Sequence, residues 1–137
     1  MEPKRILFIC VGNTCRSIMA EAICRGLGGH GVEPLSAGLA PTGRVAAQTR
    51  EALERLGYDT SGLRSKPLDE IPLRDLDTIV SLIGPAALAW LPRTVPAQRI
   101  VWNVPDPYGE DPETFERTAR RIEDLVRSLL TTLERQP

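Results

Sequence analysis

The chain has 137 residues, a formal net charge of −1 at pH 7 and 42% hydrophobic residues. This length suits a single domain, residues 1–137, with a hydrophobic core of its own. The nearly neutral charge gives no electrostatic basis for binding nucleic acid or an anionic membrane. The sequence contains no apolar run long enough to span a membrane and no N-terminal secretory signal, so we expect a cytoplasmic protein.

The three cysteines, Cys10, Cys15 and Cys24, all lie near the N-terminus. Their odd number and uneven placement argue against a disulfide scaffold. Together with the distant His30 they do not have the spacing of a zinc site, so we predict no structural metal.

The first predicted element is a buried strand that leads through a loop into a helix. Residues 6–9 form a continuous apolar run, which is typical of a strand buried on both faces. The chain then turns through residues 10–17 and continues as a helix to about Leu27, where Gly28 and Gly29 end it. The N–H groups of such a loop and the N-terminus of the helix together attract anions. We therefore predict a phosphate-binding loop, in which the fork of Arg16 holds two phosphate oxygens.

The rest of the chain alternates between strand-like and helix-like segments without a repeat. We predict strands at 32–37, 77–82 and 100–102, a helix at 44–56, a short helix at 85–91 and a long C-terminal helix with one apolar stripe, namely Phe115, Ile122, Leu125, Val126, Leu129 and Leu133. This alternation favours a parallel sheet with helices on both faces. Ligands of such sheets bind beyond the carboxyl ends of the strands, where the loop after residue 10 would lie. The apolar neighbours of Trp90 and Trp102 predict that both are core or partly buried packing residues and not a platform for a ligand.

Cys10 has the surroundings of a nucleophile. A thiol attacks as its thiolate, and the helix N-terminus, the loop N–H groups and Arg16 all favour that form. Gly12 and Asn13 suit a loop with left-handed backbone conformations, and Ser17 can donate a hydrogen bond to the sulfur. Attack on a phosphoryl group would give a phosphocysteine without a metal or other cofactor. A lone cysteine at a strand end is usually a small buried hydrophobe, but Arg16 and Ser17 favour the nucleophile here.

Asp106 is the candidate acid. It follows the predicted strand at 100–102, on a loop stiffened by Pro105 and Pro107. Its carboxyl group is placed to protonate the leaving atom and then to activate the water that hydrolyses the phosphocysteine. Asp-Pro alone is ordinary turn chemistry, and it is the combination with the Cys10 loop that favours catalysis.

Three segments together resemble the low-molecular-weight protein-tyrosine phosphatase family: residues 11–17 with Met19-Ala20-Glu21, Ser36-Ala37-Gly38, and Asp106-Pro107-Tyr108-Gly109. The resemblance covers essentially the whole chain. It implies an α/β protein, a flavodoxin-like three-layer α/β/α sandwich with a four-stranded parallel sheet. It also implies phosphorylated proteins as substrates and inorganic phosphate as product.

The resemblance assigns roles residue by residue. Cys10 is the nucleophile, Arg16 the phosphate clamp and Asp106 the general acid, and the phosphate-binding loop contains Val11, Gly12, Asn13, Thr14, Cys15 and Ser17. Asn13, Ser17 and Ser36 are expected to brace this loop. Cys15 either forms a reversible disulfide with Cys10 or simply packs. Two departures are visible: Ile18 stands where relatives usually have proline, and no histidine lies near Ser61-Gly62 to join the loop network.

The resemblance leaves three substrates open. Arsenate reductases of the family need further cysteines near positions 80–90, and this chain has none there. Arginine-directed members usually carry threonine where this chain has Thr14, whereas tyrosine-directed members carry an aliphatic residue; ordinary loop variation is the competing interpretation. Residues 39–48 also lack the aromatic wall of tyrosine-directed members, leaving Tyr108. We therefore predict protein phosphoarginine as substrate, phosphotyrosine as the alternative and arsenate as a less favoured one, with a substrate pocket made of Thr14, Leu39 and Tyr108.

Overall fold

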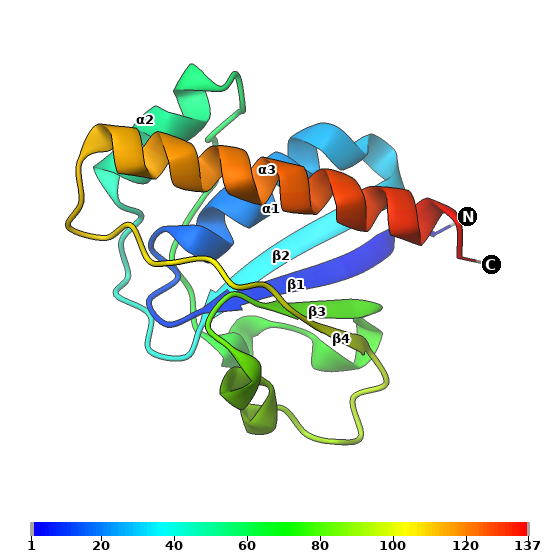
Figure 1. Ribbon diagram of the computed structural model, residues 1–137. Coiled ribbons are helices and arrows are strands. Elements are labelled where there is room, and N and C mark those ends of the chain that lie inside the picture. The colour runs from blue at the N-terminus through cyan, green and yellow to red at the C-terminus, as the bar shows by residue number, and fades with distance from the viewer. Residues whose placement is uncertain (1, 137) are drawn as a thin grey trace.

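In the computed structural model, which describes residues 2–136, four parallel strands form one sheet in the order β2-β1-β3-β4. The strands are β1 (Lys4–Cys10), β2 (Val32–Gly38), β3 (Thr78–Ser81) and β4 (Gln98–Val101). Three α-helices, α1 (Arg16–Gly28), α2 (Ala47–Arg55) and α3 (Pro112–Glu134), pack together on one face of the sheet (Figure 1). The predicted α/β class and four-stranded parallel sheet are confirmed.

The two faces of the sheet are covered by different kinds of structure. Because side chains alternate along a strand, Ile6 and Phe8 of β1 point toward the α-helices, and Leu7 and Ile9 point to the opposite face. That opposite face is covered by three short 3-10 helices, η2 (Leu68–Glu70), η3 (Leu73–Asp75) and η4 (Pro85–Trp90). Thus the three layers are present, but the second outer layer consists of single turns and connecting segments. The helix predicted at 85–91 is the 3-10 helix η4.

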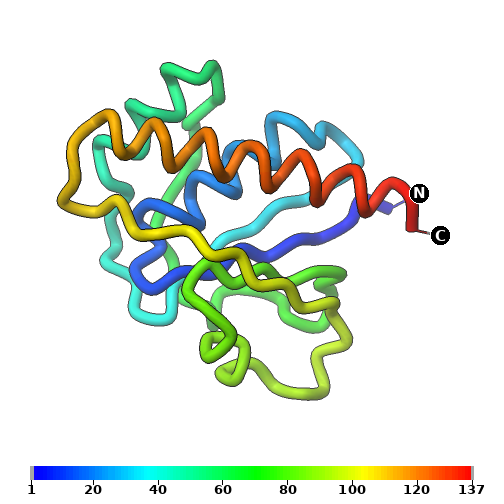
Figure 2. The backbone as a smooth tube through the Cα atoms, in the orientation of Figure 1, coloured from blue at the N-terminus to red at the C-terminus, as the bar shows by residue number. Residues whose placement is uncertain are grey.

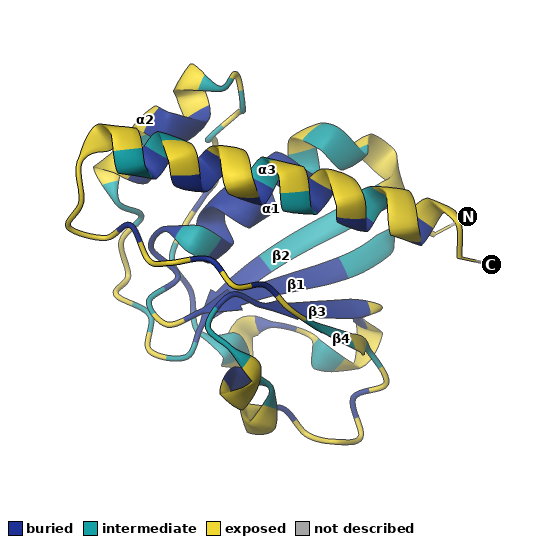
Figure 3. Cartoon of the chain, viewed as in Figure 1, coloured by how far each residue is buried: buried dark blue, intermediate teal, exposed yellow. Residues whose placement is uncertain are grey.

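α3 shows most clearly how the sequence pattern produces the packing. The side chain of Asp111 caps its first turn by accepting a hydrogen bond from the Thr114 N–H at 2.8 Å. The predicted apolar stripe is buried along the helix except at Leu125, which is half-buried, and the opposite face is exposed (Figure 3). None of the helices in residues 2–136 is long and apolar enough to cross a membrane.

The starts of α2 and β4 and the placement of Trp90 differ from the prediction. α2 begins at Ala47, three residues later than expected, because residues 39–46 run beside the loop that follows β1 (Figure 2). β4 begins at Gln98, two residues earlier than expected. Trp102 is buried as predicted, but the prediction for Trp90 is wrong, since the tight turn of η4 leaves it 74% exposed.

Candidate active site

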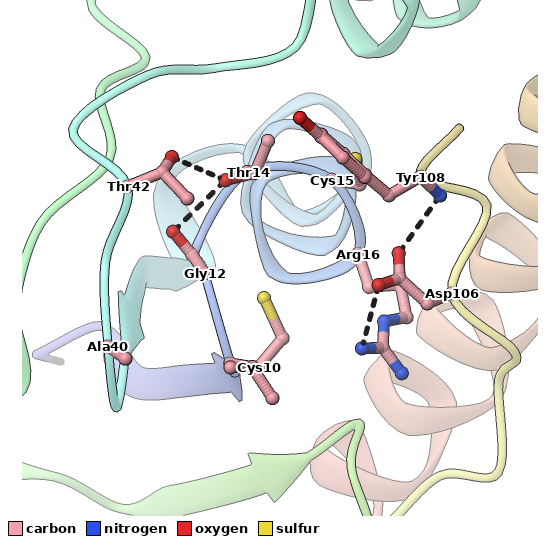
Figure 4. Close-up of a pocket in the computed structure, with 10 residues that line it drawn as sticks. Cys10, Gly12, Thr14, Cys15, Arg16, Ala40, Thr42, Asp106 and Tyr108 are labelled. Atoms are coloured by element: carbon pink, nitrogen blue, oxygen red, sulfur yellow. Dashed lines mark hydrogen bonds and ion pairs between the residues drawn. The ribbon is translucent and has the colours of Figure 1, made fainter.

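A cavity of about 280 Å³ opens at the carboxyl end of β1. Figure 4 shows the Cys10 sulfur with Ala40 and Thr42 on one side and Asp106 and Tyr108 on the other. The cavity is lined by Cys10, Val11, Gly12, Thr14, Cys15, Arg16, Ala40, Thr42, Asp106 and Tyr108. It lies where a parallel sheet places its ligands, and it brings together the predicted nucleophile, clamp and acid.

The backbone of the loop is oriented by the segment beside it. The N–H groups of Leu39, Ala40, Thr42 and Ala46 donate to four loop carbonyls, those of residues 10, 11, 12 and 14, at 2.9–3.2 Å. Among the described residues, by contrast, no hydrogen-bond acceptor contacts the N–H groups of residues 11–15. Because the carbonyls are bonded on the outside, these N–H groups remain available for an oxyanion, as in an anion-binding nest.

Gly38 explains how this close approach is possible. A Cβ atom at this position would lie 2.6 Å from the Val11 carbonyl oxygen and 2.9 Å from the Asn13 nitrogen. Both of these atoms belong to the backbone, so only glycine fits here. The glycine of the Ser36-Ala37-Gly38 triplet is therefore required by contact between β2 and the loop.

Asn13 connects the loop to the nucleophile through a directed chain of hydrogen bonds. Its Oδ1 accepts from the Lys66 N–H at 2.8 Å, so its Nδ2 is the end that donates to Ser17 Oγ, at 2.7 Å. The Ser17 oxygen thus accepts from Asn13, which leaves the hydroxyl proton for Cys10 Sγ, 2.8 Å away. The Lys66 backbone N–H can only donate, and this sets the direction of each hydrogen bond that follows. The last of them is donated by the Ser17 hydroxyl to the Cys10 sulfur, where it stabilises a thiolate.

The prediction of left-handed backbone is correct for Asn13, with φ 49°, and wrong for Gly12. Gly12 is constrained by space instead. A Cβ there would lie 3.0 Å from Thr14 Oγ1 and 3.3 Å from Thr42 Cγ2, tighter than ordinary contact.

Within the described part of the chain, Arg16 makes hydrogen bonds through Nη1 but not through Nε or Nη2. Its Nη1 donates to the carbonyl oxygens of Leu82 and Val104, each at 3.0 Å, just beyond the ends of β3 and β4. Its Nη2 lies 3.7 Å from Asp106 Oδ2. The carbonyls fix the orientation of the group, so the edge formed by Nε and Nη2 remains for bidentate binding of an oxyanion.

Asp106 lies at the mouth of the cavity. Its side chain is 52% exposed, and its Oδ1 accepts a hydrogen bond from the Tyr108 N–H at 3.1 Å. Tyr108 is itself largely exposed and is the only aromatic residue among those lining the cavity. A carboxyl group at this position can reach both a leaving atom and water from the solvent.

Of the three residues predicted for the substrate pocket, two line it. Thr14 lines the cavity, where its hydroxyl lies 2.7 Å from the hydroxyl of Thr42 and 3.1 Å from the Gly12 carbonyl oxygen. Leu39 does not, because it follows β2 on the opposite face and packs against the cluster that contains Leu7 and Ile9. Ala40 and Thr42 line the cavity instead, and a polar threonine in a turn gave no sequence signal for this role.

Ser36 braces the loop differently from the prediction. Among the described residues its hydroxyl forms no hydrogen bond with Asn13 or Ser17 and donates instead to Glu21 Oε1. Lys66 Nζ in turn donates to Glu21 Oε1 at 3.2 Å and to Ser36 Oγ at 3.1 Å. The Lys66 backbone N–H is bonded to Asn13, so the buried side chains of Ser36, Glu21 and Lys66 are linked to the loop indirectly. Nothing in the sequence pattern indicates Lys66 at this position, since lysine is seldom buried.

The other two thiols are free and buried. Burial raises the pKa of the Cys15 thiol to about 11 and that of the Cys24 thiol to about 12. Cys15 nevertheless lines the cavity at the start of α1, whereas Cys24 lies in the core.

Residues 5–137 match the family model described as low molecular weight phosphotyrosine protein phosphatase. The glutaredoxin arsenate reductase of Synechocystis sp. is 31% identical over 132 residues, which cover 95% of this chain and 98% of that protein. A solved arsenate reductase in its phosphate-binding state has a TM-score of 0.84 at 30% identity and covers 94% of this chain and 98% of its own. The YwlE arginine phosphatase from Geobacillus stearothermophilus also has a TM-score of 0.84, at 24% identity, covering 96% and 94% of the two chains, and shows the shared fold.

Proposed function

Since the chain belongs to the low molecular weight phosphotyrosine protein phosphatase family, we propose that it hydrolyses phosphorylated proteins through a phosphocysteine intermediate on Cys10. The observation that carries this proposal is that the N–H groups of residues 11–15 have no acceptor within residues 2–136 and lie around a sulfur that receives the Ser17 hydrogen bond. Such a cradle binds a tetrahedral oxyanion and stabilises the charge that develops during phosphoryl transfer.

The proposed reaction has two steps. The Cys10 thiolate attacks phosphorus, the bond to the leaving atom breaks, and Asp106 gives its proton to that atom. Asp106, now ionised, takes a proton from water as the water attacks the phosphocysteine, and the sulfur leaves as thiolate with release of inorganic phosphate. Throughout, the loop N–H groups and the free edge of Arg16 hold the phosphoryl oxygens.

Protein phosphoarginine is the substrate that we favour. Tyr108 is the only aromatic side chain lining the cavity, so a flat ring would stack on one side alone. Thr14 and Thr42 contribute two hydroxyl groups, 2.7 Å apart, to the lining of the cavity, and these suit the polar guanidino group better than an aryl ester. Phosphotyrosine is the alternative, because Tyr108 offers one aromatic contact.

Arsenate reduction is a second candidate because the Synechocystis relative and the first solved structure above are arsenate reductases. Here Cys10 would displace water from arsenate. Cys15 would then attack the Cys10 sulfur, so that the electron pair of the arsenic–sulfur bond stays on arsenic and arsenite leaves. The resulting disulfide would need an external thiol for reduction. Residues 80–90 contain no cysteine, and Cys15, with its pKa raised to about 11 by burial, is a slow attacking thiol.

One set of assays separates these functions. We expect the protein to hydrolyse p-nitrophenyl phosphate, Cys10→Ser to abolish this turnover, and Cys24→Ala, a change in a core thiol, to preserve it. No turnover by reduced, folded protein would contradict phosphatase activity. Release of arsenite from arsenate with glutathione or reduced thioredoxin, lost in Cys15→Ala, would instead support the reductase.

Substrate choice needs a direct comparison of matched peptides. We expect a higher kcat/KM for phosphoarginine than for phosphotyrosine peptides, and Thr14→Ile to shift the ratio toward phosphotyrosine. A ratio that does not change in this variant would remove the argument from Thr14.

A further inference from the structure

A lysine is buried directly behind the phosphate-binding loop, outside the cavity. Lys66 is 9% exposed, as is its partner Glu21 on α1. The Lys66 Nζ has three acceptors: Glu21 Oε1 at 3.2 Å, Ser36 Oγ at 3.1 Å and the Arg64 carbonyl oxygen at 3.1 Å. An ammonium group has three protons, so all of its hydrogen-bonding capacity is used within the protein.

The backbone of the same residue touches the catalytic loop. Its N–H donates to Asn13 Oδ1 at 2.8 Å, and its carbonyl oxygen accepts from the Gly38 N–H at 2.9 Å. The side chain therefore ties this backbone to α1 and β2, while the backbone itself holds the amide of Asn13. That amide in turn sets the direction of the hydrogen bond from Ser17 to the Cys10 sulfur.

Stability alone is a poor reason for this arrangement. Removing two charges from water costs about as much as their attraction returns, and buried ion pairs can often be replaced by apolar residues without loss. A buried pair is better suited to fixing one geometry, because each charge tolerates only a fully bonded position.

We propose that Lys66 is a positioning residue of this enzyme, whose ammonium group, bound by Glu21, Ser36 and the Arg64 carbonyl, holds Asn13 and Ser17 so that the Ser17 hydroxyl donates to the Cys10 sulfur. This inference rests on the proposed role of Cys10 as nucleophile. The ammonium group stays behind the loop and touches no reacting atom. Its loss is therefore expected to lower kcat rather than to raise KM.

The test compares a single and a double variant. Lys66→Met removes the ammonium and leaves the Glu21 carboxylate buried without its partner, so it should lower both Tm and kcat. In Lys66→Met/Glu21→Gln no charge is left unpaired and Ser36 keeps an acceptor, so Tm should largely recover. We expect kcat of the double variant to stay about tenfold below that of the parent, the size of effect that a lost hydrogen bond to a charged group produces. We expect KM to change by less than about threefold.

Alkylation gives a readout that needs no substrate. The rate at which iodoacetamide modifies Cys10 at neutral pH should fall by a similar factor, about tenfold, in the double variant, because the thiolate loses its hydrogen bond. Arg64→Met, a change in an exposed side chain of the same segment that keeps the carbonyl, should match the parent in both assays.

Parent-like kcat and alkylation in the double variant would overturn the proposal and leave Lys66 a purely structural residue. The alkylation ratio decides this question even if the parent hydrolyses no phosphorylated substrate, a result that would contradict the proposed function instead.

Discussion

Asp106 is the residue whose proposed role is most open to a direct kinetic test. Its carboxyl is half exposed and lies 3.7 Å from Arg16 across the mouth of the cavity. Asp106→Asn removes the proton donor but keeps the size of the side chain. We expect hydrolysis of substrates with poor leaving groups to slow by about 100-fold or more, the lower end of what general acid catalysis contributes. Activated p-nitrophenyl phosphate should slow by less than about tenfold, since its leaving group needs little protonation.

Glu110→Gln is the matched control for this prediction. Glu110 is an exposed carboxylate on the same loop that does not line the cavity, and its loss should leave both rates unchanged. Equal slowing of both substrate classes by Asp106→Asn would assign the acid to another residue.

At the residue scale, the sequence indicates the reacting groups better than it indicates what supports them. Cys10, Arg16 and Asp106 line the same cavity as predicted, because Cys10 ends β1, Arg16 begins the helix after it, and Asp106 follows β4 of the same parallel sheet. Leu39 was misplaced because side-chain direction alternates along extended backbone, and an error of one residue exchanges the two faces. Lys66 was missed because burial of a lysine depends on partners far away in the chain.

At the scale of elements, the contact between β2 and the phosphate-binding loop carries a separate prediction. A methyl group in Gly38→Ala would collide with the Val11 carbonyl and the Asn13 nitrogen, and neither backbone atom can move without distorting the loop. We expect tungstate to bind at least about tenfold more weakly to this variant, a loss equivalent to one good hydrogen bond. Isothermal titration calorimetry measures this affinity directly.

Gly31→Ala, directly before β2, provides the control, since a methyl group there would meet nothing within 4 Å. Its tungstate affinity should equal that of the parent. An unaltered tungstate affinity in Gly38→Ala would show that the loop keeps its anion-binding geometry at a greater distance from β2 than the structure indicates.

The order and type of the main elements were predictable because their apolar patterns are strong, as in the stripe of α3 and the continuous run of β1. The start of α2 was not, because residues 44–46 have a helix-compatible pattern, but the Ala46 N–H donates to the Thr14 carbonyl oxygen of the loop and the Arg44 N–H donates to the Thr42 hydroxyl. In the outer layer, the short helix at 85–91 was predicted, but η2 and η3 were not, since residues 68–75 carry only scattered apolar residues whose burial depends on the sheet.

At the scale of the whole molecule, the buried thiols make the free energy of unfolding fall as the pH rises through the alkaline range. Burial raises the pKa of Cys24 from 9.0 to about 12. Above pH 9.0 the Cys24 thiol of the unfolded chain therefore loses its proton, while that of the folded protein keeps it. The contribution of Cys24 to the free energy of unfolding is fully present below pH 9.0 and declines as the pH rises above it. In Cys24→Ala this contribution is absent.

Urea unfolding under reducing conditions measures the effect. The difference in unfolding free energy between the parent and Cys24→Ala should narrow above about pH 9, by up to about 1.4 kcal/mol per pH unit, the slope for one proton. A constant difference from about pH 8 to about pH 11 would mean that the Cys24 thiol ionises as easily in the folded protein as in the unfolded chain.

The central claim is that the N–H groups of residues 11–15 and the free edge of Arg16 form one oxyanion site above the Cys10 sulfur. A crystal structure with bound tungstate tests it most directly. We predict the ion in the cavity, bonded to those N–H groups and held by two nitrogens of Arg16, with its metal atom about 3–3.5 Å from Cys10 Sγ, the separation of reacting atoms poised for attack. A cavity that stays empty at saturating tungstate, or an ion bound only elsewhere on the protein, would contradict it.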